Sequence, residues 1–259
     1  MWERQRRSFE NTADVYDRVR PGYPAELFER IRRYADLAPD DSIVEVGAGT
    51  GRATTHFAEW GNPFVVIEPA PAMADAARRN LASFSNVDVR TTRFEDADLP
   101  LNTFGLFACA QAWHWLDEAT RVQRIADVLY AHGTAAIIAN VQVNPSEHLA
   151  FWERAQDVYR KHTPGMEHKG PFRAPDDLPE HPLTGSSLFE DLEQMTSAWE
   201  WTLSTDEYLA LCATHSNKAA LDDDTRSRLL GGLGELIDAE FDGKVTEHYI
   251  AVAGLARRV

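Results

Sequence analysis

The sequence has few cysteines and no long apolar runs. Its two cysteines among 259 residues, Cys109 and Cys212, are too few for the disulfide framework of a small secreted protein, and we expect both thiols to be buried and reduced. No uninterrupted apolar run approaches the ~20 residues of a membrane span. No apolar signal-peptide core follows the first residues. We therefore expect a cytoplasmic protein with no membrane partner.

Basic residues are also under-represented. Lysine and arginine number 26 against 41 acidic residues, which leaves a net charge of −15. An acidic chain is repelled by phosphate backbones and anionic lipid surfaces, so a nucleic-acid partner is not expected. Hydrophobic residues make up 44% of the chain, enough for the core of one large domain. We find no internal repeat.

The first 140 residues alternate between strand-like and helix-like segments, which predicts a parallel sheet covered by helices on both faces. The expected strands are Ser42–Val46, Phe64–Glu68, Val87–Arg90, Gly105–Ala110 and Thr134–Ala139. The expected helices are Arg52–Trp60, Pro71–Leu81 and Asp117–Ala131. Right-handed crossovers would place the carboxyl ends of the strands along one edge, where ligands usually bind.

The remaining chain predicts a helical cap and two closing strands. We expect helices at Pro145–Lys161, Thr205–Ala213 and Asp222–Phe241, and strands around Ala198–Leu203 and at Lys244–Leu255. The irregular run 162–187 is typical of a lid or binding loop. We predict one α/β domain over 1–259 with a doubly wound, seven-stranded, mostly parallel sheet. Its core is 36–140, 188–203 and 244–259, and its cap is 1–30, 141–187 and 204–240.

A glycine-rich turn directly follows the first predicted strand. Val44–Arg52 has the sequence VEVGAGTGR, in which three glycines at alternate positions let the backbone turn tightly and approach a ligand. The turn lacks the Gly-Lys-Ser/Thr of a phosphate loop, and its spacing differs from the dinucleotide fingerprint G-x-G-x-x-G. Glu45 instead suits a ligand with a cationic end.

A second carboxylate ends the second predicted strand. Glu68 follows Gly51 by 17 residues (68 − 51), and in a doubly wound sheet this position faces the binding crevice, where a carboxylate accepts both ribose hydroxyls. A glycine turn alone, or a carboxylate at a strand end alone, commonly has only a structural role. Both in this order indicate a nucleoside-binding site.

With these motifs the sequence resembles class I S-adenosylmethionine-dependent methyltransferases, specifically the small-molecule group that includes trans-aconitate methyltransferase-like enzymes. The resemblance covers about residues 9–140, and 188–255 more loosely. Its carriers are YDRVRPGYP at 16–24, VEVGAGTG at 44–51, VIEPAPAM at 66–73, RFEDADLP at 93–100 and AQAWHW at 110–115. It implies a Rossmann-like methyltransferase fold with S-adenosyl-L-methionine as cofactor.

The resemblance implies roles for the cofactor-binding residues. Glu45 would contact the methionine amino group directly or through ordered water, and Glu68 would take the ribose hydroxyls. Phe94 and Glu95 would hold the adenine face and edge, with Met73 packing nearby. The remaining cofactor-binding residues implied are Tyr16, Arg20, Gly47, Ala48, Gly49, Thr50, Gly51, Ala110 and Gln111.

Two residues are candidates for contacting the methyl acceptor. His114 would suit a general base, since an unperturbed histidine has a pKa near 6.5, and Trp113 could stack on a planar acceptor. Simpler structural roles stay open, with His114 and Trp113 only packing in the pocket wall and Phe94 a core aromatic. The other histidines lack the spacing of a metal site, so no metal is expected.

Three functions fit the sequence. The first is methyl transfer by in-line displacement to an oxygen, nitrogen or carboxyl group of a small-molecule acceptor. The second is a catalytically silent regulatory protein that binds S-adenosylmethionine. The third is a nicotinamide-dependent oxidoreductase, which would share the sheet topology and Glu68. The acceptor, the need for a base and a homodimeric assembly stay open.

Overall fold

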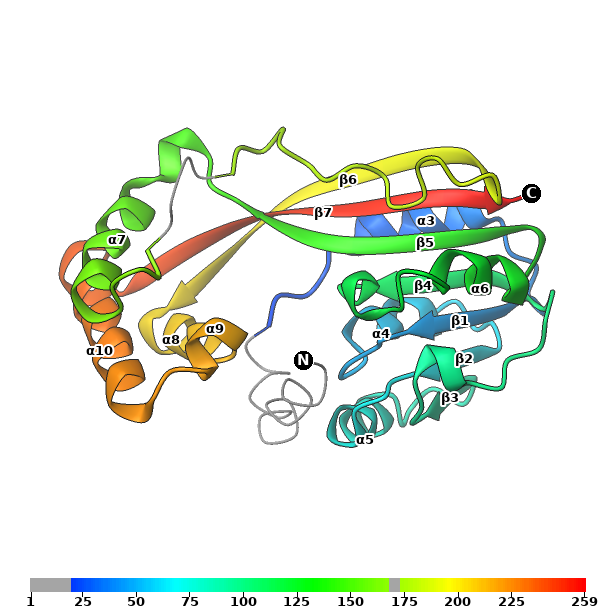
Figure 1. Ribbon diagram of the computed structural model, residues 1–259, viewed down its shortest axis with the longest axis horizontal. Coiled ribbons are helices and arrows are strands. Elements are labelled where there is room, and N and C mark those ends of the chain that lie inside the picture. The colour runs from blue at the N-terminus through cyan, green and yellow to red at the C-terminus, as the bar shows by residue number, and fades with distance from the viewer. Residues whose placement is uncertain (1–19, 168–172) are drawn as a thin grey trace. The chain divides into compact units, whose positions relative to one another are not determined.

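A computed structural model describes residues 20–167 and 173–259, and seven of its strands form one sheet (Figure 1). Their order across the sheet is β3-β2-β1-β4-β5-β7-β6. The strands are β1 (Ser42–Val46), β2 (Phe64–Ile67), β3 (Val87–Arg90), β4 (Phe104–Ala110), β5 (Leu129–Val143), β6 (Phe189–Ser204) and β7 (Lys244–Arg258). The order starts at β1 and runs outward in both directions, which is the doubly wound arrangement.

The sheet is mixed but mostly parallel. Parallel pairing joins β1 to β2 and β4, β2 to β3, and β4 to β5, whereas β7 runs opposite to its neighbours β5 and β6 (Figure 1). The central strands are mostly apolar, and all of β4 is buried, as strands covered on both faces require. The predicted fold class is confirmed.

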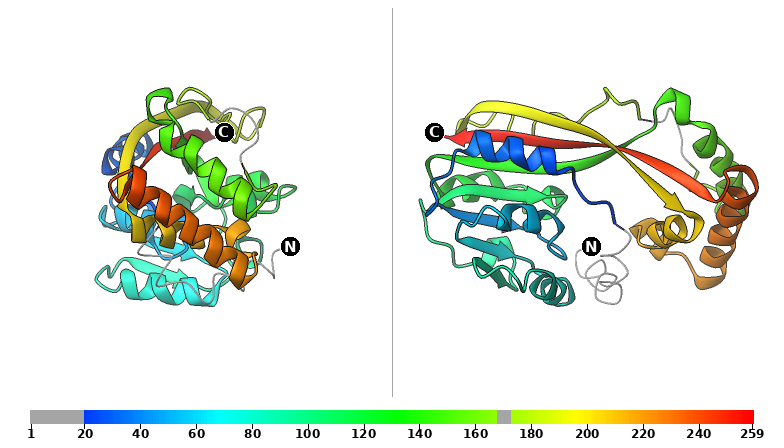
Figure 2. Two further views of the ribbon diagram at one scale, coloured as in Figure 1. Left: turned by 90° about the vertical axis from the view of Figure 1, so that its left-hand side faces the viewer. Right: turned by 180° about the vertical axis from the view of Figure 1, so that it is seen from behind.

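Helices cover both faces of the parallel strands. α6 (Arg121–Val128) lies in front of the sheet in Figure 1, and α3 (Ala25–Ala35) comes to the front when the molecule is turned by 180° in Figure 2. α3 packs on α4 (Arg52–Ala58), because the ring of Phe28 stacks on His56. The fourth helix here is α5 (Pro71–Asn80), which begins with proline in its first turn.

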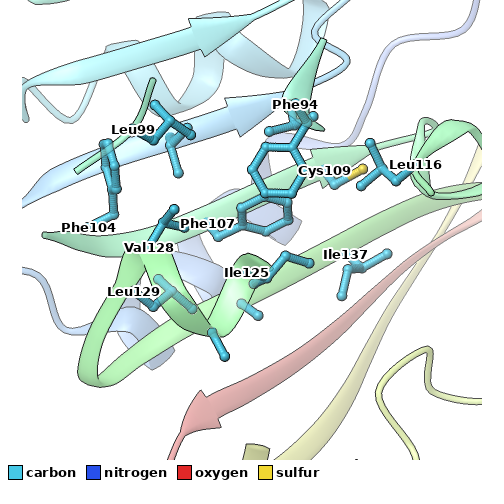
Figure 3. Close-up of a cluster of buried hydrophobic side chains, with 14 of the residues drawn as sticks. Phe94, Leu99, Phe104, Phe107, Cys109, Leu116, Ile125, Val128, Leu129 and Ile137 are labelled. Carbon is cyan, nitrogen blue, oxygen red and sulfur yellow. The ribbon is translucent and has the colours of Figure 1, made fainter. Parts of the chain in front are cut away.

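The core beneath α6 is made of large apolar side chains from several strands (Figure 3). Phe107 of β4 is fully buried, as is Ile125 of α6. Phe94, in the short helix η1 (Phe94–Asp96), contributes the ring above Phe107. This packing fixes the strand ends from which the candidate site is built.

The chain divides into two compact units. One comprises 22–140, 179–197 and 251–259 and is called the sheet unit here; the other comprises, of the described residues, 20–21, 141–167, 173–178 and 198–250 and is called the helical unit. β5, β6 and β7 contribute residues to both. The predicted single domain with a core and a cap stays a prediction.

Four α-helices of the described chain belong to the helical unit, with the short helix η3 (Ser146–His148) before them. They are α7 (Ala150–His162), α8 (Thr205–Ala213), α9 (Ser216–Ala219) and α10 (Asp223–Glu240). α7, α8 and α10 share an apolar cluster that includes Phe151, Tyr208 and Leu233. α8 begins with a capping box in which Ser204 and Glu207 bond each other's backbone, which satisfies amides otherwise left unpaired.

Several sequence expectations need correction. The strand expected around Ala198–Leu203 is longer, since β6 begins nine residues earlier, at Phe189. The helix expected at Asp117–Ala131 is shorter, because Leu129 already pairs with Phe104 as the first residue of β5. β5 therefore begins five residues before the predicted Thr134 and passes through His132, whose φ is 63°. α3 was not predicted. Tertiary pairing overrode the helical period of α6, which continues to Leu129 in the sequence.

The described residues include no helix that is both long enough and apolar enough to span a bilayer.

Candidate functional site

The glycine turn lies between the buried strand β1 and the start of α4. Gly47, Gly49 and Gly51 have φ values of 72°, 60° and 93°. L-residues with a side chain rarely adopt this left-handed region, whereas glycine enters it without a steric penalty. The alternating glycines therefore have a conformational reason, and the turn delivers the chain to Arg52, where α4 begins.

The surroundings of the three glycines differ. A Cβ on Gly47 would lie 2.3 Å from the Cβ of Ala112, and one on Gly51 would lie 3.1 Å from Cδ1 of Leu81. A Cβ on Gly49 would meet nothing within 4 Å. Gly47 and Gly51 thus permit close packing of the turn on its neighbours. Gly49 leaves open space beside the backbone, as a turn that receives a ligand requires.

Glu45 is buried within β1 with half of its carboxylate unpaired. Its side chain is 0% exposed, and Oε2 accepts a hydrogen bond of 2.6 Å from Oγ1 of Thr54. Oε1 has no hydrogen-bond partner among the residues that the structure describes. Burial raises the pKa of this carboxyl to about 7; the Thr54 bond opposes the rise, and the charge of Glu68 adds to it. A cationic donor at Oε1 would stabilise the ionised form.

Glu68 ties the end of β2 to the glycine turn. Its Oε2 accepts the backbone N–H of Gly49 at 2.9 Å, and its Oε1 accepts that of Ala70 at 2.8 Å. The residue is 6% exposed, and burial raises its pKa while the two backbone bonds oppose the rise. Each carboxylate oxygen has a second lone pair, so Glu68 retains acceptor capacity for hydroxyl donors.

The rest of the turn is held by α5. The carbonyl of Thr50 accepts a hydrogen bond of 2.9 Å from Nδ2 of Asn80, at the end of that helix. Thr50 is buried, Ala48 is half-buried and Met73 is buried on α5. The structure thus brings the predicted residues of the turn, Glu45 and Glu68 into one site.

Phe94 and Glu95 already have structural partners. The Phe94 ring centroid lies 5.5 Å from that of Phe107, and the guanidinium of Arg124 lies 5.1 Å from the Phe94 ring. Glu95 accepts the backbone N–H of Asp117 at 3.0 Å. The ring of Phe94 points into the core in Figure 3. The predicted adenine contacts of both residues stay predictions.

The carboxyl end of β4 turns sharply. Gln111 has a φ of 57°, a conformation that strains a residue with a side chain. Its backbone N–H donates to the carbonyl of Ile138 at 2.8 Å, and its Nε2 donates to the carbonyl of Asn140 at 3.1 Å. Ala110, the last residue of β4, is 8% exposed. No sequence signal marked this left-handed residue.

Trp113 and His114 lie in the short helix η2 (Trp113–Trp115), which follows this turn. The Arg121 guanidinium lies 4.1 Å from the Trp113 ring, and its Nη1 donates to the Trp113 carbonyl at 3.1 Å. Trp113 is therefore held on one side, while His114 is exposed. Partial burial lowers the pKa of His114, which favours the neutral imidazole, whose unprotonated nitrogen accepts a proton.

Two predicted residues are not placed with the glycine turn. Tyr16 lies outside the described residues. Arg20 belongs to the helical unit, where its Nη2 donates to the carbonyl of Thr214 at 2.9 Å. A cofactor role for either residue stays a prediction. Within the described ranges, no group of three or more histidine, cysteine or acidic side chains could hold a metal ion.

Sequence reasoning missed Thr54 and Asn80, whose side chains fix Glu45 and Thr50. A signal existed for Thr54, because it follows the last glycine of the turn by three residues and so lies in the first turn of the expected helix. Asn80 carried no such signal, since it is 30 residues from Thr50 in sequence.

Residues 43–133 match a protein family described as "Methyltransferase domain". Over 135 residues the chain is 31% identical to an uncharacterized methyltransferase of Mycobacterium tuberculosis, and the match covers 52% of this chain and 53% of that protein. An uncharacterized methyltransferase of Schizosaccharomyces pombe is 27% identical over 139 residues, covering 53% and 54%. The chain thus spans about half the length of the curated relatives it matches.

Solved structures share the fold over most of the chain. A protein from Anaeromyxobacter dehalogenans described as a type II methyltransferase aligns with a TM-score of 0.62 at 21% identity, covering 92% of this chain and 97% of that one. Phosphoethanolamine N-methyltransferase 2 of Haemonchus contortus, solved with S-adenosyl-L-methionine, aligns with a TM-score of 0.54 at 13% identity, covering 96% and 57%. Residues 43–133, which contain the glycine turn, are thus similar to methyltransferase domains, and the chain shares the fold of solved methyltransferases.

Proposed function

We propose that this protein transfers the methyl group of S-adenosylmethionine to a small-molecule acceptor. The observation that carries the proposal is the unpaired Oε1 of Glu45, buried beside a glycine turn whose middle glycine borders open space. A buried carboxylate oxygen without a donor costs free energy. The ammonium group of a methionine moiety would supply the missing donor and the compensating charge.

The residues of the site fit this cofactor. Glu45 would bind its ammonium group, and Glu68 would accept its ribose hydroxyls while holding the amide of Gly49. Ala110 and Gln111, at the end of β4, would border the methionine moiety. When bound, S-adenosylmethionine supplies a methyl group activated by a positively charged sulfur.

Catalysis in this proposal is mainly alignment and exclusion of water. The chain holds donor and acceptor in line for displacement. An acceptor that loses a proton requires a base, and His114 is the residue we propose, because its neutral imidazole is exposed next to the end of β4. A carboxylate acceptor is already ionised at neutral pH and requires orientation only.

The finer assignments are also proposals. The motifs at 44–51 and 110–115 support the trans-aconitate methyltransferase-like group, and the net charge of −15 supports an acceptor that is not a nucleic acid. We place the protein in the cytoplasm and leave a homodimer as one possible assembly.

Calorimetric titration tests the cofactor. Wild-type protein should bind S-adenosylmethionine and S-adenosylhomocysteine but not NADH. Glu68→Ala should weaken both by at least about tenfold, because it removes hydrogen bonds to a charged acceptor. Glu59→Ala is the matched control, since Glu59 is an exposed acid at the end of α4.

Each result has a distinct meaning. Binding of NADH without binding of S-adenosylhomocysteine would support the nicotinamide-dependent oxidoreductase. Binding of S-adenosylmethionine without turnover in an acceptor screen with a labelled methyl donor would support the regulatory protein. Turnover of a small acceptor would support the proposed methyltransferase.

A further inference from the structure

The helical unit contains a buried lysine. Lys218 lies on α9 and is 8% exposed. Its Nζ donates a long hydrogen bond of 3.4 Å to Nδ1 of His215, because an ammonium can only donate. Nζ also lies 5.6 Å from the ring centroid of Tyr159. Among residues 20–167 and 173–259, no carboxylate forms an ion pair with Lys218.

A buried ammonium without a counter-charge is costly, and lysine is almost never buried unless it is paired. The acid that acts on Lys218 electrostatically is Glu247, on β7. This carboxyl is itself buried and accepts a hydrogen bond from Gln142. Burial raises its pKa to about 7, so at neutral pH it is ionised only in part. It therefore compensates the charge of Lys218 weakly.

His215 adds no negative charge. Burial and the nearby charges of Lys218 and Arg20 lower the pKa of its imidazole to about 3, so the ring is neutral. With Nδ1 accepting from Lys218, the proton of the neutral ring is on Nε2, which is then a donor. Lys218 and His215 thus offer several N–H donors, and positive charge exceeds negative charge around them.

We propose that Lys218 and His215 form an oxyanion-binding site in the helical unit, and that its ligand carries a carboxylate or phosphate group. An oxyanion would add to the weak compensation by Glu247 and would accept the remaining N–H donors of Lys218. The ring of Tyr159, whose centroid lies 5.6 Å from Nζ, favours the cation electrostatically.

The test compares Lys218→Met with the matched control Lys161→Met, since Lys161 is an exposed lysine on α7 of the same unit. Calorimetry would use acetate, benzoate and inorganic phosphate as probes. Wild-type protein and Lys161→Met should bind at least one of them, and Lys218→Met should bind it at least about tenfold more weakly. The preferred probe distinguishes a carboxylate from a phosphate ligand.

A second readout separates binding from structure. Without any anion, Lys218→Met should raise the thermal midpoint, because methionine removes an uncompensated buried charge at similar volume. A lysine with only a structural role would lower the midpoint when replaced. Lys218→Arg should retain part of the anion affinity, since it keeps the charge.

Three results would refute the proposed anion site: no anion binding by wild-type protein, equal anion binding by Lys218→Met, or a lowered thermal midpoint in Lys218→Met. Titration of S-adenosylhomocysteine into the same variants keeps the two proposals separate. Anion binding that depends on Lys218 in a protein that does not bind S-adenosylhomocysteine would support the anion site and refute the proposed function.

Discussion

Replacing Glu45 by glutamine should stabilise the ligand-free protein at alkaline pH and weaken cofactor binding. Glutamine keeps the shape of the side chain and removes the charge that burial disfavours. Thr54 can still donate to the amide oxygen, so the hydrogen bond across β1 and α4 is retained. The variant therefore isolates the charge of Glu45 from its packing.

The magnitude follows from the pKa of Glu45. Its value of about 7 in the folded protein lies above the ordinary 4.5, so the folded state binds the proton more tightly than the unfolded state does. The stabilising contribution of Glu45 to the free energy of unfolding is therefore fully present below pH ~4.5, and it is lost as the pH rises to about 7. Because a difference of one in pKa corresponds to about 1.4 kcal/mol, wild-type stability relative to the glutamine variant should fall by about 2 to 3 kcal/mol between about pH 5 and pH 8.

Chemical denaturation of both proteins at the two pH values measures this difference. In the variant, the amide NH2 lies where Oε1 lies in the wild-type protein, which costs free energy. This cost is the same at both pH values, so it cancels when the two stability differences are compared. Calorimetry at about pH 8 should show S-adenosylhomocysteine binding weakened about 10- to 100-fold, since a hydrogen bond between charged groups is lost. If the stability difference between wild-type protein and the glutamine variant does not change with pH, the inference that ionisation of Glu45 destabilises the folded protein is refuted.

Two further predictions concern the turn and the acceptor side. Gly47→Ala should destabilise the protein by about 2 to 5 kcal/mol in urea denaturation, from left-handed strain and a clash with Ala112. Gly61→Ala should cost only about 1 to 2 kcal/mol, since its φ is 85° but a Cβ meets nothing within 4 Å; equal losses would contradict the role of the Ala112 contact. His114→Ala should lower the turnover number and leave S-adenosylhomocysteine affinity unchanged, as measured by steady-state kinetics and calorimetry. Equal losses of both would make His114 a cofactor-site or folding residue.

Local features of the sequence were sufficient to predict most elements of the parallel sheet. β3 and α8 have the predicted boundaries, because short β-branched runs and a strong cap leave few alternatives. β5 differed, since Leu129 fits the helical period of α6 but gains more by pairing with Phe104. Sequence periodicity contains no information about such a pairing with a distant strand.

Part of the candidate site could likewise be predicted from the sequence. Gly47, Gly49 and Gly51 were identifiable from sequence because each has a conformation that only glycine adopts without strain. The proximity of Glu45 and Glu68 to one turn followed from strand order in a doubly wound sheet.

The sequence by itself determined the doubly wound sheet, the glycine turn and the two carboxylates, because they follow from local patterns and from chain order. Only the tertiary structure decided that Thr54 leaves one oxygen of Glu45 unpaired, and that Lys218 is buried beside His215. Burial and missing partners depend on residues far apart in sequence, and they appear only when the chain has folded.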